Sequence, residues 1–170
     1  ESNAHNYEAH EKLFRLLVGS WRENWNDPDL PFYYVQLSSI DRPSWPWFRD
    51  SQRRLMDAIP HTGMAVSSDY GDSLDVHPKN KRPIGERLAH WALNRTYDKK
   101  QVVPSGPLFR SVDFREDAAY VSFDYADGLH TADGRPIREF EIAETEGVYY
   151  PAKAEVVGNQ VKVYSDRVKH

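Results

Sequence analysis

The chain has 170 residues, a formal net charge of −4 and no cysteine, a length that suits one ordinary domain or one domain and part of a second. The acidic balance offers no field to concentrate a polyanion, so we expect no nucleic acid partner, and the lack of cysteine excludes thiolate catalysis, disulfides and cysteine-ligated zinc. Because the first residues are polar and no apolar run approaches the roughly 20 residues of a membrane helix, we expect no signal peptide in this sequence and no membrane partner.

The first half of the chain alternates predicted helices and strands. Residues 7–25 carry apolar side chains at helical spacing with charged residues largely opposite, which predicts an amphipathic helix. Residues 32–37 form a nearly continuous apolar run, typical of a strand covered on both faces and therefore of a parallel sheet. A second helix over 47–59, a second strand over 64–67 and a third helix opened by Pro83 follow.

The second half of the chain has the pattern of an all-β domain. From about Gln101 onward, apolar and polar residues alternate and turn signals recur, and two prolines with a glycine in 103–107 interrupt both periodicities. We therefore divide the chain into an α/β part, residues 1–98, and a β-rich accessory domain, residues 99–170. Strands are expected over 109–114, 119–125, 137–142, 152–157 and 160–164.

Both parts look incomplete. Two parallel strands would leave wide sheet edges, whereas doubly wound sheets usually hold about five or more strands. The β part has too few expected strands for a comfortable sandwich. We therefore expect a fragment, with part of a parallel sheet and its flanking helices followed by a partial all-β domain.

The segment 69–79 carries the clearest chemical signal in the chain. It directly follows the second expected strand, contains several acids, and holds His77 immediately before a proline. In an open α/β sheet, ligands bind outside the carboxyl ends of the strands. A histidine with a nearby aspartate at such a strand end is suited to act as a general base.

Several motifs, in order along the chain, resemble the sialate O-acetylesterase-like branch of the SGNH (GDSL-like) hydrolase family. Each motif is weak alone, but their order and spacing together are specific. They occupy residues 1–4, 45–46, 61–66, 71–72 and 75–79 in the first part, and residues 103–107, 140–143 and 150–154 in the second.

The resemblance implies a serine esterase that removes O-acetyl groups from a sugar, built on a flavodoxin-like sheet and needing no metal or organic cofactor. His77 matches the family's catalytic base, and Asn3 matches the asparagine of its oxyanion hole. The nucleophilic serine and the oxyanion-hole glycine would precede Glu1, so the missing amino-terminal half of the catalytic domain is an expected partner. We expect residues 1–170 alone to be inactive, and the protein to be secreted or periplasmic.

The acid that orients the base is less certain from the sequence. An alcohol nucleophile needs a neutral imidazole with an acid on its other ring nitrogen. Asp75 is our choice, but the family usually spaces this pair as Asp-x-x-His and residue 74 is a leucine. Asp72 or a backbone carbonyl therefore stays an alternative.

The residues 71–74 spell the Gly-Asp-Ser-Leu signature of the family's nucleophile motif, but we do not interpret Ser73 as the nucleophile. It lies four residues before His77 in the same loop, and it follows the second expected strand rather than the family's first strand. A four-residue match carries little information against that context. A polar turn is the better interpretation.

Other chemistry-bearing residues have ordinary structural explanations. His5 and His10 lie about 140° apart around a helix, so they do not form a metal-binding pair and we expect no metal. Lys81 and its basic neighbours, residues 79 and 82, could attract an acidic sugar, although a solvated helix entrance is at least as good an explanation. Trp45 and Trp47 fit a loop anchor better than a sugar platform.

Two other functions remain open. Members of the family act on several acetylated sugars, so an esterase for acetylated xylan is the first alternative. The abundance of aromatic residues, including five Trp and ten Tyr, and the β-rich second half suggest a non-catalytic carbohydrate-binding module as the second.

Overall fold

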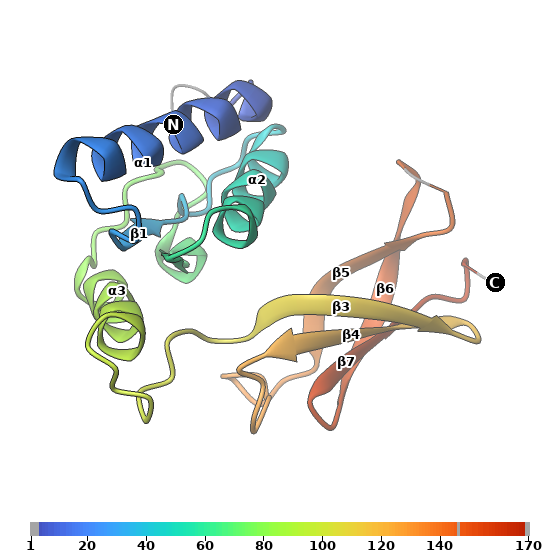
Figure 1. The fold of residues 1–170 in the computed structure, drawn as a ribbon. Helices are drawn as coiled ribbons and strands as arrows, with labels where there is room; N and C mark the ends of the chain where they lie inside the picture. Colours follow the sequence, from blue (N-terminus) through green and yellow to red (C-terminus); the bar gives the residue numbers. More distant parts are fainter. Residues whose placement is uncertain (1–3, 146, 169–170) are drawn as a thin grey trace. The chain divides into compact units, whose positions relative to one another are not determined.

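The computed structural model describes residues 4–145 and 147–168 (Figure 1). The chain separates into two compact units, Glu1–Ser105 and Gly106–His170. The division falls inside the segment 103–107 with its prolines and glycine, a few residues after the boundary at 98/99 that we expected. What each unit does is not decided by this division and stays a prediction.

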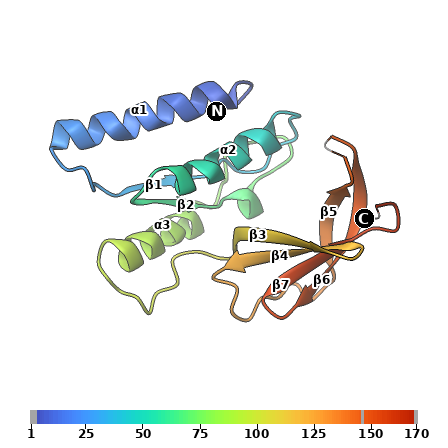
Figure 2. The ribbon, with the colours of Figure 1, turned by 45° about the vertical axis from the view of Figure 1, so that its right-hand side comes forward.

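The first unit alternates helices and strands, as the sequence predicts. In Figure 2, α1 and α2 lie on one side of the β1–β2 pair and α3 lies on the other. The two strands pair in parallel, with Tyr34 opposite Met64. A larger flavodoxin-like sheet stays a prediction, since the described residues give this sheet two strands. The elements are α1 (Tyr7–Trp25), β1 (Phe32–Val35), α2 (Trp45–Ala58), β2 (Thr62–Ala65), the 3₁₀ helix η1 (Ser68–Tyr70) and α3 (Arg82–Arg95).

Helix α1 has the predicted bounds but an unexpected environment. The side chain of Asn6 accepts a 3.0 Å hydrogen bond from the Ala9 N–H at its start, and Asn26 ends it in the left-handed conformation. Val18 is its buried residue, whereas Leu16 and Trp25 are 69% and 68% exposed. Much of the apolar stripe is thus uncovered within the described residues. None of the described helices is both long and apolar enough to cross a bilayer.

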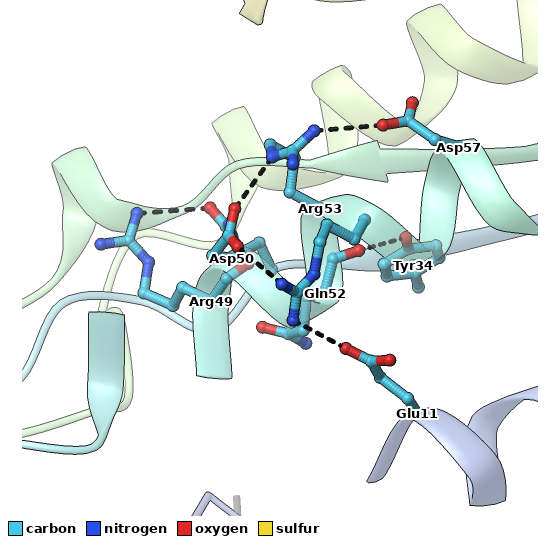
Figure 3. Close-up of polar contacts among 9 residues, drawn as sticks. Glu11, Tyr34, Arg49, Asp50, Gln52, Arg53 and Asp57 are labelled. Atoms are coloured by element: carbon cyan, nitrogen blue, oxygen red, sulfur yellow. Dashed lines mark hydrogen bonds and ion pairs between the residues drawn. The ribbon is translucent and has the colours of Figure 1, made fainter. Parts of the chain in front are cut away.

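Helix α2 contacts the end of β1, and Figure 3 shows the hydrogen bond between Tyr34 and Gln52. The Tyr34 hydroxyl donates to the Gln52 carbonyl at 2.6 Å, and the Gln52 side-chain oxygen accepts from the Leu37 N–H at 3.0 Å. A side chain thereby takes the place of a neighbouring strand, so β1 ends at residue 35 rather than at 37 as predicted. An ion pair of 3.0 Å between Arg54 and Glu11 joins α2 to α1.

Strand β2 lies two residues earlier than the predicted range 64–67. Its start contains Gly63, over which the Trp91 ring of α3 packs so closely that a Cβ at position 63 would lie 2.5 Å from it. The Trp91 indole N–H donates to the Met64 carbonyl at 2.9 Å. Glycine is a poor strand residue by propensity, and this close helix–strand approach explains why it is present.

The second unit is a five-stranded antiparallel sheet in the order β3-β4-β7-β6-β5. The five strands confirm the all-β prediction. Alternate residues of the central strands point to one face and form the core with Ile142 and Val168, while β3 is largely exposed. The strands are β3 (Leu108–Arg115), β4 (Ala118–Asp124), β5 (Ile137–Ala143), β6 (Tyr149–Val157) and β7 (Gln160–Tyr164).

Candidate functional site

A pocket of about 270 Å³ lies where the carboxyl ends of β1 and β2 meet. Because the two strands are parallel, the segments that follow them emerge at the same edge, which is the usual place for a ligand in such sheets. The lining has no aspartate or glutamate and includes Val35, Ser38, Ser67, Val76, His77 and Lys81. The pocket therefore combines apolar walls with a histidine and a cation.

The structure brings His77 and Asp75 together beside this pocket. Nδ1 of His77 lies 2.8 Å from Oδ1 of Asp75, and the backbone N–H of His77 donates to the same oxygen at 2.9 Å. The side chains are 75% and 52% exposed. The contact orients the ring so that Nδ1 carries a proton toward the carboxylate and Nε2 is available as a base.

The hydrogen bonds to Asp75 also keep its carboxylate ionised. The backbone N–H of His77, and after it the His77 ring, hold the pKa of Asp75 below its usual value. An ionised carboxylate is the form that can stabilise a neighbouring imidazolium when the base takes up a proton.

The two alternative orienting groups make no contact with Nδ1 among the described residues. Oδ1 of Asp72 accepts the Leu74 N–H at 2.8 Å, so this carboxylate caps its own turn. The ring nitrogen of His77 meets the Asp75 carboxylate and no described backbone carbonyl. The geometry favours Asp75 as the orienting acid, although its role stays a prediction.

The loop that carries His77 is fastened to the segment after β1. The Ser38 hydroxyl donates to the carbonyl of Val76, directly before the histidine, and the backbone carbonyl of Ser38 accepts the Trp45 indole N–H at 2.6 Å. The Asp41 N–H donates to the Ser73 carbonyl at 3.0 Å. Trp45 is 2% exposed, so it anchors this loop and presents no face to a sugar.

Arg87 of α3 forms a second attachment, which our sequence interpretation missed. Its guanidinium makes a two-bond pair with the Asp69 carboxylate, 2.7 and 2.6 Å long, and also donates to the Val66 carbonyl at 2.7 Å. The hydrogen bonds from Arg87 lower the pKa of Asp69. An arginine 18 residues after the acid gives no local signal, and only the fold shows that it holds the start of the loop.

Within the described residues, no serine is hydrogen-bonded to His77. Ser38 and Ser67 line the pocket, but their hydroxyls donate to the carbonyls of Val76 and Gln36. The Ser73 hydroxyl forms no hydrogen bond with the histidine ring. Asn3, the expected oxyanion-hole residue, lies outside the described residues. The described site thus contains the predicted base and the predicted orienting acid, and their roles stay predictions.

His10 of α1 packs against aromatic rings. The His10 ring packs 4.6 Å from Phe48 and 5.9 Å from Phe14, measured between ring centroids, and burial lowers the pKa of His10. Across residues 4–145 and 147–168, no group of three or more His, Cys, Asp or Glu side chains is arranged to hold a metal ion.

Comparison with known proteins relates the chain to acetylesterases, although no family model matches it. A solved structure of a carbohydrate acetylesterase from Xanthomonas citri superposes with a TM-score of 0.86 at 34% identity, over 94% of this chain and 38% of that one. By fold and sequence, the chain is therefore similar to a carbohydrate acetylesterase.

Two mammalian proteins are also similar to this chain. The sialate O-acetylesterase of Mus musculus is 26% identical over 147 residues, which cover 74% of this chain and 27% of the mouse protein. The sialate O-acetylesterase of Rattus norvegicus is 22% identical over 187 residues, covering 96% of this chain and 34% of the rat protein. The chain is similar to sialate O-acetylesterases, as its ordered motifs predicted, and it spans about a third of the length of the proteins that it matches.

Proposed function

We propose that this chain is the part of a carbohydrate O-acetylesterase that carries the catalytic base, and that a segment outside residues 1–170 supplies the nucleophilic serine. The main support is the 2.8 Å contact between His77 and Asp75 beside a pocket at the ends of two parallel strands. The acetylesterases to which the chain is similar give the class of reaction.

In the proposed reaction, Nε2 of His77 removes the proton of the serine hydroxyl while its oxygen attacks the acetyl carbonyl. The imidazolium that forms is stabilised by Asp75 through Nδ1–H. His77 then returns the proton to the sugar oxygen as the ester bond breaks, leaving an acetyl-enzyme. Water attacks this intermediate with His77 again as base, and acetate leaves. The amide of Asn3 is proposed to donate to the oxyanion.

The pocket fits a small acyl group next to a polar sugar. Val35, Val76 and Ile84 supply apolar surface, and Lys81 is the cation of the described lining. An ammonium group at this position would attract the carboxylate of an acidic sugar. We therefore propose an O-acetylated sialic acid as substrate, with acetylated xylan as the alternative.

The test uses the full-length protein that contains this chain. We expect acetate release from 9-O-acetyl sialic acid to exceed that from acetylated xylo-oligosaccharide, and His77→Ala to reduce both by roughly 10³-fold or more. The control is His90→Ala, which removes an exposed histidine of α3 and should leave activity unchanged.

Undiminished hydrolysis by His77→Ala would refute the proposed base. Equal rates on the two substrates would refute a sialate-specific enzyme. Residues 1–170 alone should release no acetate, and acetate release by them that is lost in His77→Ala would show that the nucleophile lies within this chain.

A further inference from the structure

The second unit contains a cavity of about 480 Å³ that the proposed esterase reaction does not use. It lies where β4 ends and the β6–β7 turn begins. Its polar lining combines a donor, two acceptors and three side chains that do both, namely Arg110, then Asp124 and Asp127, then Ser122, Asn159 and Gln160. A cavity of this size is within the range of small-ligand sites.

The polar side chains of this cavity are already held in place by one another. The Gln160 amide donates to the Ser122 hydroxyl at 2.7 Å, and the Asn159 amide donates to Oδ1 of Asp127 at 3.1 Å. Each pair keeps unused capacity, since an amide oxygen and the second carboxylate oxygen can still accept hydrogen bonds. Groups fixed before binding lose little freedom when a ligand arrives, which favours binding.

The charge of the lining points to a neutral ligand. Asp124 and Asp127 carry two negative charges, and Arg110 carries one positive charge, which lies in a 3.3 Å pair with Asp124. The balance is one negative charge, so an anionic ligand such as a sialic acid would be repelled. Neutral hydroxyl groups instead suit a set of carboxylate, amide and hydroxyl partners.

Tyr125, which also lines the cavity, has a strained backbone. Its φ of 57° lies in the left-handed region, which is unusual for a bulky aromatic residue. Such conformations persist where the surrounding structure enforces them, and they concentrate at binding sites. A tyrosine ring beside fixed polar groups offers a flat apolar surface on which the C–H face of a sugar can lie.

We infer that this cavity is a carbohydrate-binding site for a neutral oligosaccharide. Tyr125 supports one face of a sugar ring, while Asp127, Asn159 and Gln160 bond its hydroxyl groups. The site is non-catalytic and lies wholly within the second unit. It does not depend on the role of His77, so it can be tested without measuring ester hydrolysis.

The test is chemical-shift mapping on ¹⁵N-labelled residues 1–170 with millimolar xylohexaose, cellohexaose or N-acetylneuraminic acid. At least one neutral hexasaccharide should shift the backbone amides of Tyr125, Asp127 and Asn159, and the charged sugar should not. Unchanged amides at these positions with both hexasaccharides would overturn the inference. Shifts confined to residues around His77 would overturn it as well.

A matched pair of variants isolates the tyrosine ring. Tyr125→Asn removes the ring and places at this position a residue that adopts the left-handed conformation readily, so the fold should persist while affinity falls roughly tenfold or more. Glu116→Asn is the same kind of change at φ 51° in the β3–β4 turn, away from the cavity, and should bind normally.

Equal affinity of the two variants, or equal loss in both, would contradict the inference. Melting temperatures show whether each variant is folded. If Tyr125→Asn melts early, Asp127→Ala provides the second test, because it removes the carboxylate that holds Asn159 and should also weaken binding.

Discussion

The two units position their functional groups in different ways. In the second unit, β4 and β7 pair over 118–122 and 160–164, so the backbone ladder places Ser122 and Gln160 of the cavity, next to the turns that carry Asp127 and Asn159. In the first unit, the two strands are four residues long, and the groups of interest lie in loops beyond them. There, hydrogen bonds from Ser38, Trp45 and Arg87 to the backbone do the positioning. A backbone ladder therefore fixes part of the cavity, whereas hydrogen bonds from side chains fix the loop that carries His77.

The largest expected effect concerns Asp75, the acid that we propose orients His77. In the full-length enzyme, Asp75→Asn should lower kcat by about 10³–10⁴-fold, because an amide that donates to Nδ1 stabilises the wrong tautomer of His77. Asp72→Asn is the matched control, since Asp72 caps a turn and does not contact the ring. Acetate release measures both. Similar losses of kcat in the two variants would show that activity depends on the loop as a whole rather than on Asp75.

The next effect concerns the close approach in the first unit. Gly63→Ala should lower the free energy of unfolding by about 2–3 kcal/mol, because the added methyl group would overlap the Trp91 ring. The control is Gly85→Ala in α3, where nothing lies within 4 Å, which should stabilise by about 0.5–1 kcal/mol. Tryptophan fluorescence during denaturation reports the unfolding of the first unit, because all five Trp precede residue 106. Equal changes in the free energy of unfolding for the two variants would contradict the tight packing of Trp91 over Gly63.

A smaller effect is expected in the core of the second unit. Val163 is buried in β7, and Val163→Ala should lower the free energy of unfolding by about 2 kcal/mol through lost methyl groups and the cavity left behind. Val157→Ala, at an exposed position of β6, should have little effect. Amide hydrogen exchange in β4 and β7 measures both. A large effect of Val157→Ala would mean that this side of the sheet is also covered.

The smallest expected effect is a pH dependence of the stability of the first unit. Burial lowers the pKa of His10 in the folded state below its ordinary value of 6.5, so between the two values the unfolded chain binds more protons than the folded one. Stability from this residue is therefore present above pH 6.5 and is lost as the pH falls below it. Urea denaturation at pH 7.5 and 5.5 should show this loss.

His10→Phe should reduce this pH dependence, because the substituted ring can still pack against Phe48 without taking up a proton. The exposed His90, replaced by Phe, serves as the control and should retain the dependence. An unchanged difference between the two pH values in His10→Phe would assign the effect to another group.

Much of the fold could be predicted because its signals are local. Periodicity, continuous apolar runs and turn signals predicted the three α-helices and all seven strands of the described residues, and the bounds of α1 were correct. The predicted bounds of strands were wrong where contacts between residues distant in the sequence determine the structure. Gln52 ends β1, and Trp91 explains Gly63 in β2. The uncovered stripe of α1 could not be foreseen, because amphipathicity shows which side is apolar and not what covers it.

The residues of the candidate site likewise separate into those that the sequence predicted and those that it missed. His77 and Asp75 were found from the sequence because their contact spans two residues, although the spacing departs from the family pattern. Arg87 was missed because its partner Asp69 lies in a different element. The cavity at Tyr125 gave no sequence signal, since it combines an unusual φ angle with side chains of neighbouring strands.

The double contact between His77 and Asp75 separates two properties of the base. Its ring and its backbone bond the same carboxylate oxygen, so the orientation of the ring is set within three consecutive residues. Its location instead depends on Ser38, which holds the preceding carbonyl. A substitution at Ser38 would release the backbone carbonyl before His77, whereas a substitution at Asp75 would release both the ring and the backbone N–H of His77.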